Sequence, residues 1–333
     1  MHDLKGEEFG LIHFYLYEDN LNKIKDWEDN PLRYYEKSIP TICVFRFEES
    51  HFVMIYREGN ASKTDAVIRN MIESYQFFYE ERNMDYRIIC SHSSTQFQTG
   101  QEYIALADFV RGRMPLNTVY RCTGEDITAF SRAKYILGEL HDIYQKHDLE
   151  DERVKVYCQP VLNTNTGTFS TAEALMRLEL PECGMVYPDQ FIPLAEKQDY
   201  IHVLSLIILH KTCINIRNME QKGYRIERIS VNFSTLELRD KNFCNDVIRV
   251  IKDTGIDFGK IAIELTESQN EQDFEMVKTI MTELQTSGIK FYLDDFGTGY
   301  SNFERIIGLP IDIIKFDRSL TILAGKDEGS RYM

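Results

Sequence analysis

The stretch KFYLDDFGTGY, residues 290–300, decides how this chain folds. Its apolar first part, 290–293, ends in two adjacent carboxylates, Asp294 and Asp295, and glycine-containing residues follow. A short apolar run bounded by turn residues is typical of a buried strand. Acidic side chains at the end of such a strand would lie at one edge of a sheet, where they can act together with neighbouring strand ends.

Similar runs recur along the second half of the chain, and four of them carry a candidate polar residue: Glu173, Asn232, Glu264 or Lys315. The runs lie at 154–157, 173–177, 229–233, 261–265, 290–293 and 311–316. Helical stretches at 201–219, 241–254 and 273–287 separate most of them. Strands that alternate with helices predict a parallel sheet, and six strands in series favour a (β/α) barrel over an open sheet.

In such a barrel the catalytic residues lie at the carboxyl ends of the strands. Glu173, Asn232, Glu264, Asp294 and Asp295 would therefore meet at one mouth and offer only oxygen ligands, which favours Mg²⁺ or Mn²⁺ over zinc. Two adjacent carboxylates could bridge two metals about 4 Å apart, an arrangement suited to attack on a phosphodiester.

Lys315 could offset charge on the transferring phosphoryl group or steer the attacking water. Taken singly, each acidic residue has a simpler interpretation as a solvated cap or turn residue, and Asp294-Asp295 as a helix N-cap pair. The order of the polar residues, one per strand, argues for a joint site.

Composition limits the class of protein. The 333 residues suit two domains, and 43% hydrophobic with 27% charged residues indicates a globular chain. A net charge of −15 argues against a nucleic-acid polymer or a membrane surface as partner. It leaves a small anionic substrate open, because metal ions can reverse the local field.

The cellular location follows from cysteine usage and hydropathy. Seven scattered cysteines without a Cys-x-x-Cys pair favour a reducing cytoplasm. No signal peptide and no apolar run of about 20 residues is visible, which predicts no membrane contact within this chain. A membrane anchor upstream of residue 1 stays open.

The first half mixes strand and helix patterns, which predicts an α/β sandwich. An apolar stretch at 9–17, a hairpin formed by 41–47 and 52–56, a helix at 68–79 and short strands at 86–90 and 118–122 are expected. Apolar spacing predicts one long helix over 126–147, with Thr123 and Asp126 as its start signal. We expect domains at 1–122 and 153–333, joined by a connecting helix within 123–152.

The run Glu173-Ala174-Leu175-Met176-Arg177 resembles the signature of EAL domains, the phosphodiesterases that linearise cyclic di-GMP (c-di-GMP). The resemblance runs from residue 157 to residue 319. Its further motifs, in order and with family-like spacing, are YCQP (157–160), FIPLAE (191–196), VNFS (231–234), ELTE (264–267), DDFGTGYS (294–301) and KFDRS (315–319). It implies a TIM-like barrel whose first strand runs against the others.

The resemblance also implies a two-metal site for Mg²⁺ or Mn²⁺. Glu173, Asn232, Glu264 and Asp294 match the family's metal ligands, and Asp295 matches the acidic partner at the second metal.

The remaining matches concern catalysis and substrate. Lys315 matches the catalytic lysine, and Glu267 matches the glutamate that anchors the loop after Asp295. Gln159 and Arg177 match positions that contact the substrate. The expected reaction is hydrolysis of c-di-GMP to linear pGpG.

The chain departs from the family at its C-terminus. Family members continue through two more strands, with a Glu-Gly-Val-Glu motif and a Gln-Gly-Tyr motif, and neither motif occurs here. We therefore expect an EAL domain that lacks its last two strands and a polypeptide that is inactive alone.

The N-terminal half resembles a degenerate GGDEF domain. Arg46 and Phe52 of the family's hairpin are retained, but its Gly-Gly-Asp-Glu core is replaced by residues 48–51, EESH. Two glutamates there would repel phosphates, so we expect a non-cyclising regulatory module, with His51 at the surface of the hairpin. An unrelated α/β sensor domain is the alternative, and the long helix would couple the domains or mediate a homodimer.

Two other functions remain alternatives to a c-di-GMP phosphodiesterase. One is a non-catalytic c-di-GMP receptor or regulatory interaction module, and the other is a different metal-dependent phosphoesterase on the same scaffold.

Overall fold

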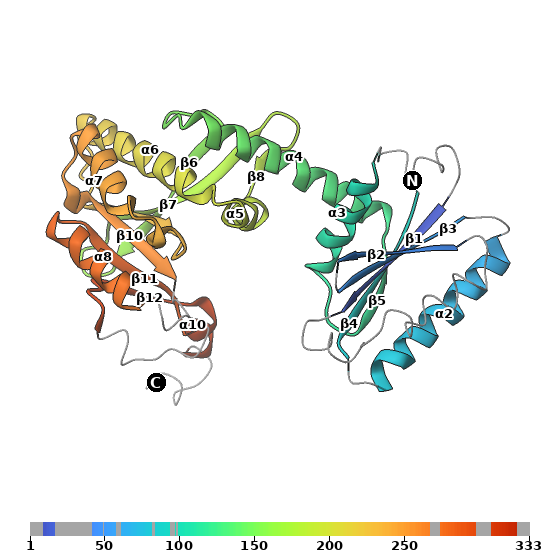
Figure 1. Ribbon diagram of the computed structural model, residues 1–333. Coiled ribbons are helices and arrows are strands. Elements are labelled where there is room, and N and C mark those ends of the chain that lie inside the picture. Colours follow the sequence, from blue (N-terminus) through green and yellow to red (C-terminus); the bar gives the residue numbers. More distant parts are fainter. Residues whose placement is uncertain are drawn as a thin grey trace. The chain divides into compact units, whose positions relative to one another are not determined.

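The computed structural model describes residues 9–16, 42–48, 50–57, 61–81, 84–93, 97, 99–266, 274–297 and 308–324. The chain divides into two compact units, 1–132 and 133–333 (Figure 1). The division falls within helix α4 (Gly124–Lys146). At the start of α4 the side chain of Asp126 accepts hydrogen bonds from the backbone N–H and the hydroxyl of Thr123, which confirms the predicted start signal.

The N-terminal unit is built on a five-stranded sheet in the order β2-β3-β1-β4-β5. The strands are β1 (Phe9–Leu16), β2 (Ile42–Glu48), β3 (His51–Arg57), β4 (Tyr86–His92) and β5 (Thr118–Arg121). β1 lies in the middle and is antiparallel to β3 and β4, whereas β5 is parallel to β4.

Helices α2 (Ala61–Glu81) and α3 (Gly100–Arg111) pack on the two faces of this sheet. Alternate residues of β1 point to opposite faces. Ile12 and Phe14 share a buried cluster with Tyr75 of α2, whereas Tyr15 shares one with Leu106 of α3. The predicted strands and helix of this half are therefore present, with helices on both sides of the sheet.

The prediction that His51 lies at the surface was wrong. His51 is 2% exposed and is paired with Tyr15 within the sheet, where their rings stack 4.1 Å apart. Its Nε2 lies 3.1 Å from Nδ1 of His13, which is 0% exposed. The physical reason is the register, because β3 already begins at His51 and directs the ring onto the face that α3 covers.

The C-terminal unit is built on a curled sheet in the order β12-β11-β10-β9-β7-β6, with β8 added to β7. The strands are β6 (Val154–Asn163), β7 (Thr168–Leu180), β8 (Gly184–Val186), β9 (Arg228–Phe233), β10 (Ile261–Thr266), β11 (Lys290–Phe296) and β12 (Ile313–Phe316). β7 and β9 to β12 are parallel. β6 is antiparallel to β7, which confirms that the first strand runs against the others. Among the described residues, β6 and β12 are the two edges, so the sheet forms a half-barrel.

Helices cover one face of this sheet. They are α5 (Pro188–Lys197), α6 (Ile201–Gln221), α7 (Phe243–Thr254) and α8 (Phe274–Thr286), and all four share a buried core with the sheet. The short turns η4 (Glu237–Arg239) and η5 (Phe258–Lys260) precede α7 and β10, and helix α10 (Arg318–Ala324) follows β12. Val231 and Ile263 share one buried core with α6 and α7. The residues between the core positions of each strand point to the opposite face, and that is where the polar strand residues lie.

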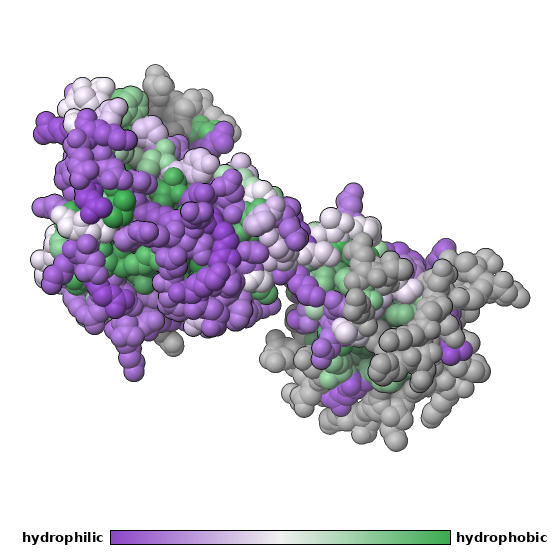
Figure 2. Space-filling view, turned by 90° about the horizontal axis from the view of Figure 1, so that it is seen from above, coloured by the Kyte–Doolittle hydropathy of each residue, from purple (hydrophilic) through white to green (hydrophobic). Residues whose placement is uncertain are grey.

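Surface character agrees with the composition. On the face drawn in Figure 2, most of the described surface is hydrophilic, with apolar patches between the polar residues. None of the helices in the described part of the chain combines the length and apolar character needed to cross a bilayer.

Candidate metal centre

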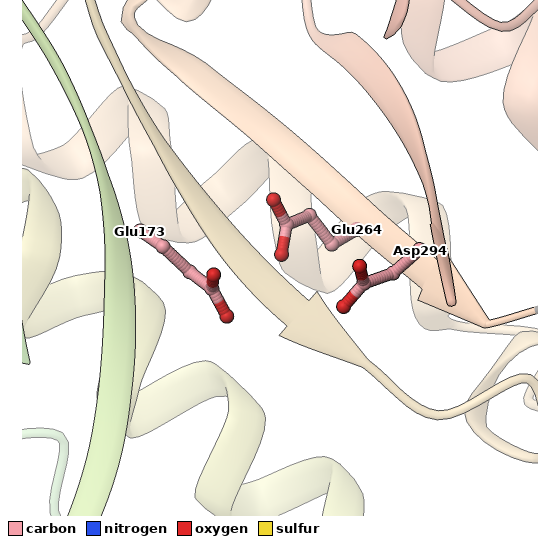
Figure 3. Close-up of side chains that lie close together, drawn as sticks. All are labelled: Glu173, Glu264 and Asp294. Carbon is pink, nitrogen blue, oxygen red and sulfur yellow. The ribbon is translucent and has the colours of Figure 1, made fainter. Parts of the chain in front are cut away.

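Three carboxylates from three strands converge on one face of the half-barrel. Glu173 of β7, Glu264 of β10 and Asp294 of β11 each place a carboxylate oxygen within 4.8 Å of the other two. Figure 3 shows the three side chains pointing toward one another. Strand register explains this convergence, because Glu264 is paired with Asn232 on one side and with Tyr292, two residues before Asp294, on the other.

Lys315 of β12 connects the three carboxylates. Its Nζ donates to Oε2 of Glu173 and to Oε2 of Glu264, both at 2.9 Å, and lies 3.4 Å from Oδ1 of Asp294. The carboxylate of Glu264 is only 1% exposed, whereas the lysine side chain is 29% exposed. One cation thus faces three carboxylates, and the group keeps a net negative charge.

The protonation states follow from this arrangement. Burial raises the pKa of Glu264, Lys315 opposes that effect, and Glu173 adds to it. Burial alone would lower the pKa of Lys315, but its hydrogen bonds to Glu173 and Glu264 raise the pKa above its usual value. Lys315 therefore stays cationic at any physiological pH.

Asn232 and Asp295 flank the three carboxylates. Asn232 donates from Nδ2 to Oε1 of Glu173 at 2.9 Å. Asp295 is exposed and adopts φ of 52°, a left-handed backbone conformation that is uncommon for a non-glycine residue. Burial and the nearby carboxylates of Asp294 and Asp317 raise the pKa of Asp295. Asp295 therefore lies beside the cluster and is not one of the three converging carboxylates.

The other predicted site residues lie on the same sheet or outside the described residues. Gln159 of β6 is exposed and directly opposite Glu173, so both side chains point to the same face. Arg177, four residues after Glu173 on β7, shares that face, donates to the carbonyl of Met176 at 2.7 Å and lies over the ring of Tyr187 at 5.1 Å. Glu267 lies outside the described residues.

The donor set fits a hard divalent cation. Carboxylate and carboxamide oxygens are the ligands that Mg²⁺ and Mn²⁺ prefer, and the cluster contains no imidazole or thiolate. The ammonium of Lys315 stands among these carboxylates, which shows that their field favours a cation. Glu173, Asn232, Glu264 and Asp294 are the residues that would hold it.

Comparison with known proteins agrees with this site. Residues 144–333 match the sequence profile of the EAL domain, which is more than half of the chain. This chain belongs to the EAL family. The EAL match includes each of the residues that surround the carboxylate cluster.

Relatives and solved structures resemble this EAL chain over different lengths. Cyclic di-GMP phosphodiesterase PdeL of Escherichia coli K12 is 31% identical over 185 residues, 56% of this chain and 51% of PdeL. Oxygen sensor protein DosP of the same organism is 25% identical over 346 residues, 95% of this chain and 41% of DosP. The PaMucR phosphodiesterase in complex with c-di-GMP has 29% identity and a TM-score of 0.51, covering 58% of this chain and 77% of that one. The chain spans about half or less of these two curated relatives.

A cleft of about 300 Å³ lies between the sheet and helices α5 and α6, and Asn232 is the one candidate ligand among the described residues that lines it. Asn232 and Leu175 line it on the sheet side, and α5 and α6 line it on the helix side. Its polar residues include Glu196, Ser234 and Glu237, and Ser234 Oγ donates to Oε1 of Glu196 at 2.6 Å.

The sequence analysis missed Glu237 as a functional candidate. The spacing Ser234-x-x-Glu237 is a capping-box pattern that could have revealed it. The backbone N–H of Ser234 does donate to Oε2 of Glu237, at 2.8 Å.

Proposed function

We propose that the EAL domain of this chain hydrolyses c-di-GMP to linear pGpG in a reaction that depends on Mg²⁺ or Mn²⁺. One observation carries the proposal: the carboxylates of Glu173, Glu264 and Asp294 converge around the ammonium of Lys315 on one face of the half-barrel. The names of PdeL and of PaMucR, both phosphodiesterases, support c-di-GMP as the substrate.

Hydrolysis breaks one of the two phosphodiester bonds of the cyclic dinucleotide. The oxygen of one water forms a bond to phosphorus, the ribose 3′ oxygen leaves with a proton, and the linear product keeps a 5′ phosphate. A bound divalent ion supplies Lewis acidity at the phosphoryl oxygens and lowers the pKa of the attacking water.

The chain's own residues would prepare this reaction. Lys315 holds a permanent positive charge beside the site and can stabilise negative charge on the phosphoryl group. Asp295, with its raised pKa, is suited to accept a proton from water and to pass it on. Gln159 and Arg177 point to the same face of the sheet as Glu173, which supports the proposal that they bind the substrate.

For the N-terminal unit we propose a regulatory role as a non-cyclising GGDEF-like module. The sequence EESH at residues 48–51 supports the loss of cyclase activity, since glutamates repel phosphates. The burial of His51 against Tyr15 and His13 adds support, because this side chain cannot reach a nucleotide at the hairpin.

The decisive experiment incubates the full-length protein with c-di-GMP and either Mg²⁺, Mn²⁺ or EDTA, and separates the products by chromatography. The expected result is pGpG with either metal and none with EDTA. Glu173→Ala should remove the product, whereas Glu179→Ala, an exposed position on the same strand, should not.

The other outcomes are equally informative. Binding of c-di-GMP without turnover would replace the proposal by a non-catalytic receptor. Equal turnover of unrelated phosphodiesters would indicate a different phosphoesterase.

A further inference from the structure

The buried carboxylate of Glu237 lies outside the metal centre. Glu237 begins the turn η4, directly after β9, and its side chain is 0% exposed. Burial raises the pKa of Glu237, while hydrogen bonding to His202 and to Ser234 lowers it. Because burying a carboxylate is costly unless it is well bonded, its partners indicate what it holds in place.

Glu237 joins helix α6 to the segment that follows β9. Its Oε2 accepts hydrogen bonds from Ser205 Oγ on α6 at 3.0 Å and from the backbone N–H of Ser234 at 2.8 Å. Its Oε1 lies 3.4 Å from Nδ1 of His202, also on α6. The carboxylate thus fixes a strand end against a helix whose first turns are largely buried.

Strand pairing holds the end of β9 on one side only. Toward β10 the pairing continues to Phe233, but toward β7 the last pair is Ala174 with Val231. Asn232 follows directly after that last pair. On the β7 side the segment is instead held by the bonds of Ser234 to Glu237 and to Glu196.

We propose that Glu237 is a positioning residue for Asn232. By fixing the backbone two residues after Asn232, it keeps the carboxamide at the carboxylate of Glu173 and within the metal centre. The inference rests on the proposed function, because it assigns Asn232 to a divalent cation. Residues that orient a ligand in this way typically change metal affinity or activity by about 10–100-fold when removed.

The test measures Mn²⁺ affinity of the full chain by electron paramagnetic resonance of free Mn²⁺, in the absence of c-di-GMP. Glu237→Ala should weaken Mn²⁺ binding by about 10-fold or more. Glu237→Gln should stay closer to the parent, because its carbonyl oxygen can take over both hydrogen bonds of Oε2. The double variant Glu237→Ala with Asn232→Ala should bind no more weakly than Asn232→Ala alone, since Glu237 acts through Asn232.

Two results would overturn the inference. One is unchanged Mn²⁺ affinity in a folded Glu237→Ala, and the other is a double variant whose loss is the sum of the two single losses. If Glu237→Ala does not fold, Ser205→Ala replaces it, because this change removes one hydrogen bond of Glu237. It should weaken Mn²⁺ binding several-fold, and unchanged affinity would again overturn the inference.

Mn²⁺ affinity and c-di-GMP turnover, measured together, separate this inference from the proposed function. A chain that binds Mn²⁺ through Asn232 but leaves c-di-GMP intact would refute the function and keep the positioning role. If the protein hydrolyses c-di-GMP, and Glu237→Ala changes neither Mn²⁺ affinity nor turnover, the proposed function stands and the positioning role is refuted. A parent chain without Asn232-dependent Mn²⁺ binding would refute both the metal centre and the positioning role.

Discussion

Replacing Lys315 with methionine removes the ammonium among three carboxylates and keeps an unbranched side chain of similar length. The lost contacts are 2.9 Å to Glu173, 2.9 Å to Glu264 and 3.4 Å to Asp294. Because the carboxylate of Glu264 is 1% exposed, water cannot replace the lost partner. The variant should therefore be less stable than the parent when no divalent ion is present.

The size of the loss follows from the geometry. Two unit charges 2.9 Å apart attract each other by about 6 kcal/mol at an effective dielectric constant of about 20, and desolvation offsets much of this. Removing one partner of a buried pair costs about 3–5 kcal/mol. With Lys315 29% exposed, we expect the lower end, about 3 kcal/mol. For a unit of this size the melting temperature should fall by about 6–12 °C.

The loss should depend on pH in a defined direction. The folded-state pKa of Glu264 is already raised by burial, and it rises further without Lys315. A carboxyl with a raised folded-state pKa stabilises the fold below its unfolded pKa and loses that contribution as pH rises through the folded pKa. The loss in free energy of unfolding caused by Lys315→Met should therefore be large at pH 7 and smaller toward pH 5. Saturating Mn²⁺ should also reduce it, because the ion supplies the missing positive charge.

The assay is thermal unfolding of the parent and the variant in EDTA at pH 7 and pH 5, and with Mn²⁺ at pH 7. Lys155→Met is the matched control, because Lys155 pairs with Glu179 at the surface, 3.1 Å apart, and such a pair contributes at most about 1 kcal/mol. If Lys315→Met melts like Lys155→Met in EDTA at pH 7, or if its deficit is the same at both pH values, the reasoning is refuted.

Three further outcomes are expected. Glu173→Ala removes the acceptor of Asn232 and Lys315, so pGpG formation should fall at least about 100-fold, whereas a smaller fall would move the reaction elsewhere. Burial, with the neighbouring His51, lowers the pKa of His13 to about 3, so the N-terminal unit should lose about 1.4 kcal/mol per pH unit from this histidine as pH falls below about 6.5. His13→Phe should flatten that slope in urea unfolding, and an unchanged slope would contradict the burial. Gly297 has φ of 97° and an added Cβ would lie 2.1 Å from Leu320, so Gly297→Ala should destabilise the fold by about 1–3 kcal/mol. Gly138→Ala in α4, where nothing lies within 4 Å, should leave unfolding unchanged or stabilise it by about 1 kcal/mol.

Strands β9 to β12 were predictable because each is a short run of mostly apolar residues. β6 and β7 extend beyond the predicted ranges 154–157 and 173–177, because they pair with each other as a long antiparallel hairpin. The convergence of Glu173, Glu264 and Asp294 was predictable for a related reason. Neighbouring parallel strands bring polar residues close together when those residues are near each other in register and point to the same face of the sheet.

The environment of individual side chains was not predictable. His51 looks like a residue of an exposed hairpin, yet pairing with β1 places it under α3 against His13. Glu237 looks like a surface capping residue, yet α6 buries it. In both positions, elements distant in the sequence bury the side chain. The neighbouring residues along the chain do not predict that burial.

By itself, the sequence determined the order of strands and helices, the membership of the EAL family and the oxygen ligands suited to a divalent cation. Periodicity and motif spacing are local properties, so they can be read along the chain. Only the tertiary structure decided that Lys315 lies between Glu173 and Glu264, that Asp295 stands beside the cluster, and that Glu237 supports the strand of Asn232. Distances and burial depend on how distant segments pack, and packing fixes the charge, the pKa values and the geometry with which the site acts.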